Sequence, residues 1–179
     1  DVYYCNADGS NVTQVTSTWT YNKFFAAWGP SDTVYYSVCE TALYADPFHI
    51  HSINLDGTSP QLFLNCETAA IDQIWEGFVV NDTTLVYCHV YTGAPDNEQI
   101  YKINLDGTGK TPLHAFPERM YSHIRPVSGG TYALYMDKDG DGYRQIYRIT
   151  VTDLLAGDFT NVEQITTSQT DKDNQYRRR

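Results

Sequence analysis

The sequence predicts an all-β fold, a β-propeller built of four-stranded blades, with three complete blades and partial blades at both ends. Two observations lead to this prediction. A unit of about fifty residues recurs along the 179-residue chain, and each copy contains short runs that alternate between apolar and polar residues. Helical periodicity is weak throughout: the best candidate, "TDLLAGDF", is short and is interrupted by Gly157.

The most regular part of the unit is a turn. "INLDGTSPQLF" and "INLDGTGKTPL" start at Ile53 and Ile103, and "VYYCNADGSNVTQV" has the same form upstream. Their aspartates are Asp8, Asp56 and Asp106, which lie 48 and 50 positions apart. Asp-Gly between alternating runs favours a hairpin, because glycine accepts a positive φ. We therefore expect these turns to join the third and fourth strands of successive blades. A fourth copy, "QIYRITVTDLLAGDFTNVEQI", loses the tight turn to an insertion.

The other strands follow the turns in order. The runs "FFAAW", "GFVV" and "IRPV" are candidate first strands, and "TVYYSVCE", "TTLVYCHVY" and "TYALYM" are candidate second strands. The predicted division is a partial blade at 1–17, blades at 18–66, 67–116 and 117–167, and the start of a further blade at 168–179. A β-sandwich is the alternative, although it needs no such periodicity.

The predicted blades at the two ends are incomplete. Each blade of a propeller buries its faces against neighbouring blades. Either the chain is part of a longer protein, or a second copy supplies the missing strands by self-association through open blade edges.

Composition excludes some functions. A net charge of −10 argues against a nucleic-acid partner, because phosphates would be repelled. No apolar run approaches the ~20 residues that cross a bilayer. The chain starts as a mature secreted protein or a fragment would, so we expect an extracellular or periplasmic location. The sequons at Asn11 and Asn81 are candidate glycosylation sites, relevant only to a eukaryotic secretory route.

Four cysteines leave two alternatives open. An even number is compatible with two disulfides, and the other possibility is four buried free thiols. The residues are Cys5, Cys39, Cys66 and Cys88, and since none forms a C-x-x-C pair, a zinc site is not predicted.

One acidic stretch, "MDKDGDGYRQIY", is a candidate calcium site. Aspartates at alternate positions followed by glycine can wrap oxygens around one cation. The candidate ligands are Asp137, Asp139, Asp141, the carbonyl of Tyr143 and the amide of Gln145. The alternative is an ordinary polar hairpin tip, where aspartate and glycine are common turn residues.

Catalytic motifs are missing from the sequence. It contains no G-x-S-x-G, no H-E-x-x-H and no glycine-rich phosphate loop. We therefore expect no catalytic residues, and calcium is the one cofactor that the motifs suggest.

The motifs also resemble a known family. "IYKINLDGTGKTPL" resembles the blade motif of TolB-like propellers, which are related to propellers of the low-density-lipoprotein-receptor type. "FFAAWGPSDTVYY" is similar to the first-strand pattern of the TolB-like group, with Gly29 where serine is usual, and the Tyr-Trp-Thr-Asp signature of the receptor type is absent.

The resemblance covers nearly the whole chain. Together with the repeat, the missing catalytic motifs and the open blade edges, it leaves three functions to consider. The first is a non-enzymatic binding or scaffold module that presents a face to a protein or glycan. The second is an accessory propeller of a serine peptidase of the prolyl-oligopeptidase type, or a polysaccharide lyase. The third is a structural subunit that assembles through open blade edges.

Overall fold

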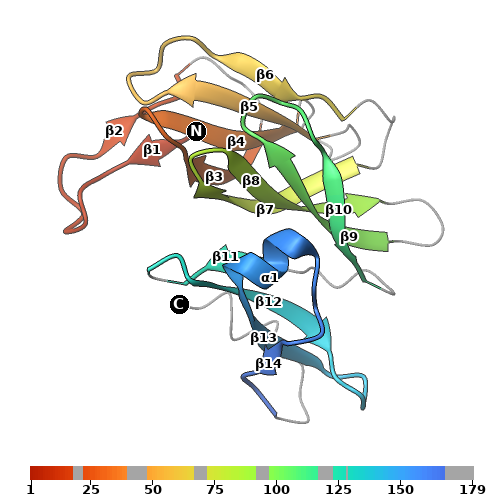
Figure 1. Ribbon diagram of the computed structural model, residues 1–179. Helices are drawn as coiled ribbons and strands as arrows, with labels where there is room; N and C mark the ends of the chain where they lie inside the picture. The colour runs from red at the N-terminus through yellow and green to blue at the C-terminus, as the bar shows by residue number, and fades with distance from the viewer. Residues whose placement is uncertain are drawn as a thin grey trace.

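The computed structural model describes residues 1–17, 22–39, 48–66, 72–91, 97–116, 123–127 and 129–167. These residues form antiparallel sheets that follow the chain order (Figure 1). The N-terminal sheet is β1 (Tyr3–Tyr4) and β2 (Thr13–Gln14). The first blade is β3 (Asn22–Trp28), β4 (Thr33–Cys39), β5 (Phe48–Asn54) and β6 (Gln61–Leu64). The second blade is β7 (Asp72–Asn81), β8 (Thr84–Tyr91), β9 (Asn97–Asn104) and β10 (Thr111–Ala115). The third blade is β11 (Arg125–Pro126), β12 (Tyr132–Lys138), β13 (Arg144–Thr150) and β14 (Glu163–Gln164), with helix α1 (Val151–Ala156) between its last two strands.

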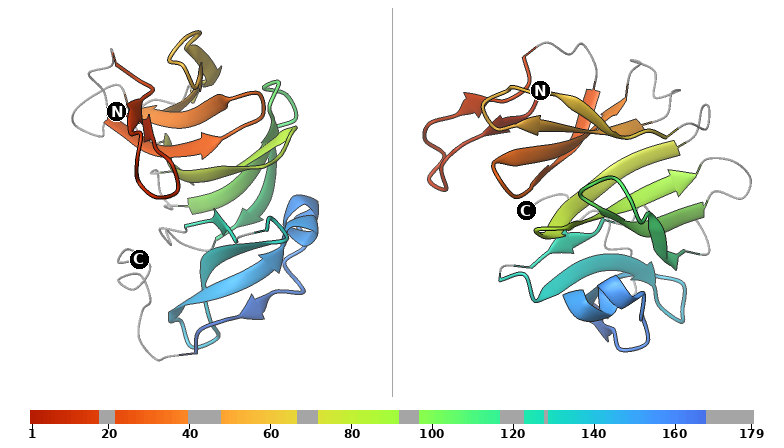
Figure 2. Two further views of the ribbon diagram at one scale, coloured as in Figure 1. Left: turned by 90° about the vertical axis from the view of Figure 1, so that its left-hand side faces the viewer. Right: turned by 45° about the horizontal axis from the view of Figure 1, so that its top comes forward.

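Each four-stranded sheet is a meander in which consecutive strands pair. The first strand of each sheet therefore lies at one edge and the last strand at the other. The first strands β3, β7 and β11 contact one another in turn, so the three blades meet along these inner edges. Both views in Figure 2 show the three blades one above another in chain order.

The core consists of layers between neighbouring sheets. One cluster joins the first and second blades and includes Phe25, Phe48 and Tyr101. A second joins the second and third blades and includes Phe78 and Tyr135. A third, smaller cluster of mainly β-branched side chains joins the N-terminal sheet to the first blade. Side chains alternate between the two faces of a strand. A strand with apolar residues on both faces therefore needs a neighbouring sheet on each side to bury them.

The predicted turns are present. Gly57 and Gly107 have φ of 82° and 85°, in the left-handed region that favours glycine. In both turns the preceding aspartate, Asp56 or Asp106, accepts hydrogen bonds from the backbone N–H and the hydroxyl of a threonine two residues later. These contacts close the turn between the third and fourth strands.

Helix α1 is the exception to the all-β prediction, and Gly157 ends it. Thr150 is its N-cap, because its side chain accepts a hydrogen bond from the N–H of Asp153. Gly157 is its C-cap, with φ of 70°. The interruption in "TDLLAGDF" is thus the normal end of a six-residue helix. Asp158 then makes the same contacts to Thr160 as the aspartates of the other turns make.

No disulfide joins the four cysteines, all of which lie in the described ranges, so the alternative of two disulfides is not supported. Cys39, Cys66 and Cys88 are buried, whereas Cys5 is exposed and so differs from the alternative of four buried thiols. The predicted further blade at 168–179 lies outside the described residues. No helix in the described ranges is long and apolar enough to span a membrane.

Candidate functional site

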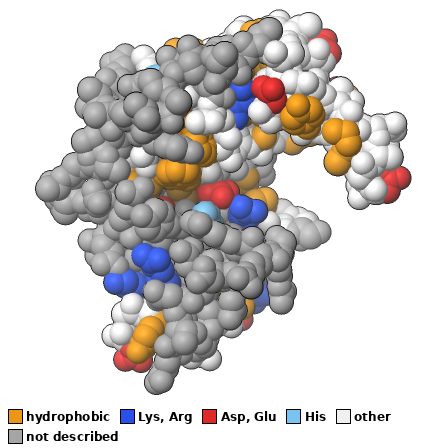
Figure 3. Space-filling view, turned by 180° about the vertical axis from the view of Figure 1, so that it is seen from behind, with side chains coloured by type: hydrophobic (Ala, Val, Ile, Leu, Met, Phe, Trp, Pro, Cys, Tyr) orange, Lys and Arg blue, Asp and Glu red, His pale blue; other side chains and the backbone are white. Residues whose placement is uncertain are grey.

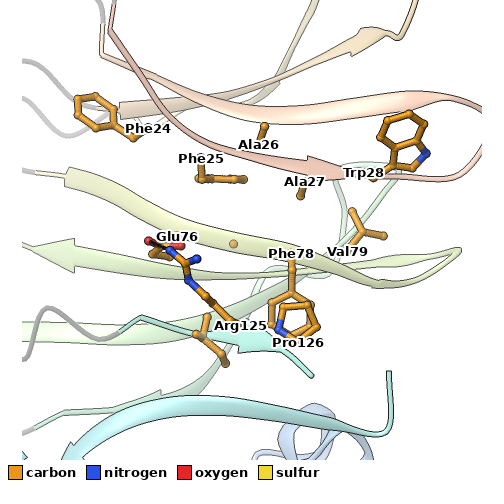
Figure 4. Close-up of a pocket in the computed structure, with 12 residues that line it drawn as sticks. Phe24, Phe25, Ala26, Ala27, Trp28, Glu76, Phe78, Val79, Arg125 and Pro126 are labelled. Carbon is orange, nitrogen blue, oxygen red and sulfur yellow. Dashed lines mark hydrogen bonds and ion pairs between the residues drawn. The ribbon is translucent and has the colours of Figure 1, made fainter. Parts of the chain in front are cut away.

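The inner edges of the three blades form a groove of about 590 Å³. It lies between β3, β7 and β11, and Figure 4 shows the side chains that line it. The strands approach closely at Gly77, where an added Cβ would lie 3.1 Å from the Phe25 ring and 3.1 Å from the Val86 carbonyl oxygen. Glycine at this position therefore lets the Phe25 ring pack directly on the backbone of β7.

Four of the described residues that line the groove are aromatic. Strand β3 contributes Phe24, Phe25 and Trp28, and β7 contributes Phe78. Trp28 is 55% exposed, although its ring meets that of Tyr4 edge-on at 6.1 Å. At the other end of β3, Phe24 packs against Trp75 with 4.9 Å between ring centroids. An exposed aromatic ring beside a packed aromatic wall is suited to contact with an apolar ligand surface.

A carboxylate crosses the groove from the second blade to the third. Glu76 Oε1 accepts hydrogen bonds from Nδ1 of His123 at 3.0 Å and from Nη2 of Arg125 at 2.9 Å. Figure 4 shows the Glu76 and Arg125 side chains pointing toward each other. In Figure 3, acidic, histidine and basic side chains gather at the middle of the face.

The environment of Glu76 sets its charge. Burial raises its pKa, but the hydrogen bond from His123 and the charge of Arg125 outweigh burial, so the net shift is downward. Glu76 is therefore ionised at neutral pH. The Arg125 side chain remains 54% exposed, so its positive charge is accessible from the solvent at the groove.

This arrangement offers the chemistry of binding. Of the described residues that line the groove, none is serine, threonine or cysteine, and Glu76 is the single carboxylate. Its Oε1 already accepts from two donors. Apolar packing, ring stacking and hydrogen bonds from Arg125 are what the lining provides.

The candidate calcium residues lie elsewhere, on the β12–β13 hairpin. Asp139 Oδ1 accepts from the backbone N–H of Asp141 and Tyr143, and its Oδ2 accepts from the amide of Gln145 at 3.1 Å. The Gln145 oxygen accepts from Thr166. Asp137 lies on β12, with its Oδ2 3.6 Å from Nε2 of His114.

These contacts bring Asp139 and Gln145 together as parts of the turn. The described residues contain no cluster of three or more histidine, cysteine or acidic side chains arranged to bind a metal. The side-chain oxygens of Asp139 and Gln145 accept hydrogen bonds from protein donors. Such contacts are also expected of an ordinary polar hairpin tip without a metal ion. The calcium site stays a prediction.

Both candidate glycosylation residues are exposed. Asn11 follows the first turn, and Asn81 lies at the β7–β8 turn, where its oxygen accepts from the N–H and hydroxyl of Thr83.

Comparison with solved structures identifies the fold. TolB from Acinetobacter baumannii superposes with a TM-score of 0.65 at 17% identity, over 94% of this chain and 38% of that one. A chain of the nidogen/laminin complex superposes with a TM-score of 0.65 at 12% identity, over 94% of this chain and 57% of that one. The fold is that of a β-propeller, which both of these structures share.

A third similar structure is prolyl oligopeptidase B from Galerina marginata, with a TM-score of 0.57 at 15% identity, over 94% of this chain and 22% of that one. The chain thus spans between 22% and 57% of the length of these three chains. No family model matches the sequence, and no curated protein matches it.

Sequence reasoning located the strands of the groove but missed its charged residues. Glu76 carried a signal, since it stands alone in the apolar run "IWEGFVV". His123 and Arg125 flank Ile124 in "SHIRPV", and nothing in that stretch indicated a role for them. Their meeting depends on how the second and third blades pack, which no local pattern encodes.

Proposed function

We propose that the chain is a non-enzymatic binding module of an extracellular or periplasmic protein, and that the groove between β3, β7 and β11 binds a segment of a protein partner. The observation that carries the proposal is the combination of exposed Trp28, the aromatic wall of β3 and the exposed guanidinium of Arg125. Aromatic and arginine side chains are enriched where proteins bind one another.

The groove chemistry indicates the ligand class. An apolar side chain can pack against the exposed ring of Trp28, and a carboxylate can pair with the positive charge of Arg125. The fold similarity to a chain of the nidogen/laminin complex supports a protein partner. The location is supported by the similarity to TolB.

The test is selection of peptides from a random displayed library on the full chain. Selected peptides should contain an apolar residue near an acidic one. Trp28→Ala and Arg125→Ala should each weaken their binding by about tenfold or more, as expected for buried contacts at an interface centre.

Tyr143→Ala is the matched control, because Tyr143 is an exposed aromatic residue on the distant β12–β13 hairpin. Peptides that bind the Trp28 and Arg125 variants as well as the unmodified chain would refute the groove as the site.

A glycan is the second candidate ligand, favoured by the exposed ring of Trp28. A flat exposed aromatic ring can pack against the apolar face of a sugar. A glycan array probed with the chain and with Trp28→Ala separates the candidates: oligosaccharide binding that needs Trp28 favours a glycan.

A third candidate function is an accessory propeller domain in a larger serine peptidase, which the fold likeness to prolyl oligopeptidase B supports. The sequence of the complete gene tests it. A nucleophile elbow, G-x-S-x-G, in a neighbouring domain would favour the peptidase.

A further inference from the structure

A second cleft lies between the first and second blades and shares no lining residue with the groove. It has a volume of about 410 Å³, within the range of small-molecule sites. Strands β4, β5 and β6 and the residues that follow β5 form one wall, and Leu105, Asp106 and Gly107 of the turn after β9 form the other. Both blades are complete four-stranded sheets, so this outer cleft lies inside the stack of blades.

The corresponding place between the second and third blades is filled by α1. The turn glycines show that the two interfaces correspond, because each approaches a carbonyl oxygen of the preceding fourth strand. An added Cβ would lie 3.9 Å from the Phe63 oxygen at Gly107 and 3.3 Å from the Leu113 oxygen at Gly157. Helix α1 directly precedes Gly157 and contacts β10 of the second blade (Figure 1). The turn of the second blade reaches Gly107 without a helix, and the outer cleft remains open there.

The third strands of the two interfaces differ accordingly. Lys102 pairs with Thr111 across its ladder as Ser52 pairs with Gln61. Nζ of Lys102 donates to the Leu155 carbonyl of α1 at 2.7 Å. At the outer cleft the same position carries the short hydroxyl side chain of Ser52, which lines the open space.

The lining combines neutral polar groups with apolar surface. Ser59 and Gln61 are exposed, so their hydroxyl and amide groups are accessible from solvent. Leu62 is 53% exposed, and Phe63 is half-buried. No lysine, arginine or histidine is among the described residues that line the cleft. This combination suits a neutral ligand that presents hydroxyl groups and C–H surface together.

Asp106 adds a charged acceptor. Its Oδ1 accepts from the N–H and hydroxyl of Thr108 at 2.9 and 2.6 Å, and its Oδ2 can accept from a ligand. The hydrogen bond from the Thr108 hydroxyl is the main cause that holds the pKa of Asp106 below its ordinary value, so the carboxylate is ionised at neutral pH. An anionic ligand would be repelled, whereas a sugar hydroxyl can donate to this carboxylate.

Ser59 has a backbone conformation that the equivalent turns give to other residues. Asn11, Ser59 and Gly109 each lie two residues after a turn glycine, with φ of 54°, 54° and 68°. Glycine adopts a positive φ freely and asparagine does so more often than most residues, whereas serine is uncommon there. The turn itself therefore gives no reason for serine, and a ligand contact from the Ser59 hydroxyl gives one.

We propose that the outer cleft is a second binding site, independent of the groove, and that its ligand is a neutral sugar. The hydroxyls of the sugar form hydrogen bonds with Ser59, Gln61 and Asp106, and the C–H face of its ring packs on Leu62. The sugar occupies the place that α1 fills at the next interface.

The test is saturation-transfer-difference NMR of the full 179-residue chain with neutral sugars, namely glucose, galactose, mannose, maltose, cellobiose and lactose. At least one of them should show transfer. Gln61→Ala should raise its dissociation constant about fivefold or more, because the change removes a hydrogen-bonding side chain. Ser59→Gly should have the same effect, and Gly109 in the next turn shows that the backbone accepts glycine there. Circular dichroism spectra verify that both variants fold.

Thr111→Ala is the matched control, because Thr111 occupies the place of Gln61 at the interface that α1 fills. It should leave the dissociation constant within about twofold. Trp28→Ala separates the two sites, since Trp28 lines the groove and not the cleft. Sugar binding that Gln61→Ala weakens and Trp28→Ala leaves unchanged supports the proposal.

Three results would overturn the proposal. The first is the absence of transfer from every sugar in the panel. The second is sugar binding that requires Trp28, which would place the sugar in the groove. The third is sugar binding that neither Gln61→Ala nor Ser59→Gly weakens.

Discussion

Four aspartates close the outer turns of four successive sheets through one contact. Asp56, Asp106 and Asp158 each accept from the N–H and hydroxyl of a threonine two residues later, and Asp8 accepts from the N–H of Ser10. The hydrogen bond from the threonine hydroxyl is the main cause that lowers the pKa of the first three below the ordinary 3.8. The ionised form is thus favoured in the folded chain.

This contact predicts an acid-sensitive stability. Because the folded pKa is lowered, the stabilisation is present above pH 3.8 and is lost as pH falls through the folded value. The melting temperature should drop more steeply below that pH in the unmodified chain than in Asp56→Asn/Asp106→Asn, as followed by circular dichroism. Asp82→Asn is the control, since Asn81 is the acceptor in its turn. Equal slopes in all three proteins would contradict the prediction.

Glu76 is the residue that connects the second blade to the third in the groove. Glu76→Ala removes the acceptor for His123 and Arg125 and should cost about 1–3 kcal/mol of unfolding free energy. Urea denaturation measures it. Glu163→Ala is the control, because the pair of Glu163 with Arg148 is more exposed and should contribute under about 1 kcal/mol. A larger loss in the control would show that Glu76 is not a main inter-blade contact.

The β12–β13 hairpin allows a direct test of calcium. If Asp139 and its neighbours bind the ion, EDTA should lower the melting temperature of the chain, calcium should restore it, and Asp139→Ala should be insensitive to both. A melting temperature that EDTA does not change would leave Asp139 with its turn contacts alone.

At the scale of elements, α1 depends on its two ends. The helix has six residues, too short to be stable by itself, so its caps and Leu154 in the core stabilise it. Thr150→Ala should destabilise the chain by about 1 kcal/mol in urea denaturation, while Thr150→Ser keeps the capping oxygen and should not. An equal loss in the serine variant would attribute the effect to the threonine methyl group.

The sequence predicted the elements that local chemistry determines. Asp-Gly turns and alternating strands need few distant contacts, so the positions of Gly57 and Gly107 followed from the residues alone. Helix α1 was missed because six residues are too few for periodicity, although Thr150 with Asp153 and Gly157 is a cap pattern. The groove was missed because it depends on which strands meet after the blades pack.

At the scale of the whole molecule, the blades stack in chain order and meet along their first strands β3, β7 and β11. Apolar side chains fill the space between neighbouring sheets, so each blade depends on its neighbour for burial.

The cysteines of this protein differ in exposure, which allows one of them to be labelled selectively. Burial raises the pKa of Cys88, and Cys39 and Cys66 are buried as well, whereas Cys5 faces solvent on the N-terminal sheet. A maleimide dye should label one position without any engineering, since access and thiolate formation both govern the reaction.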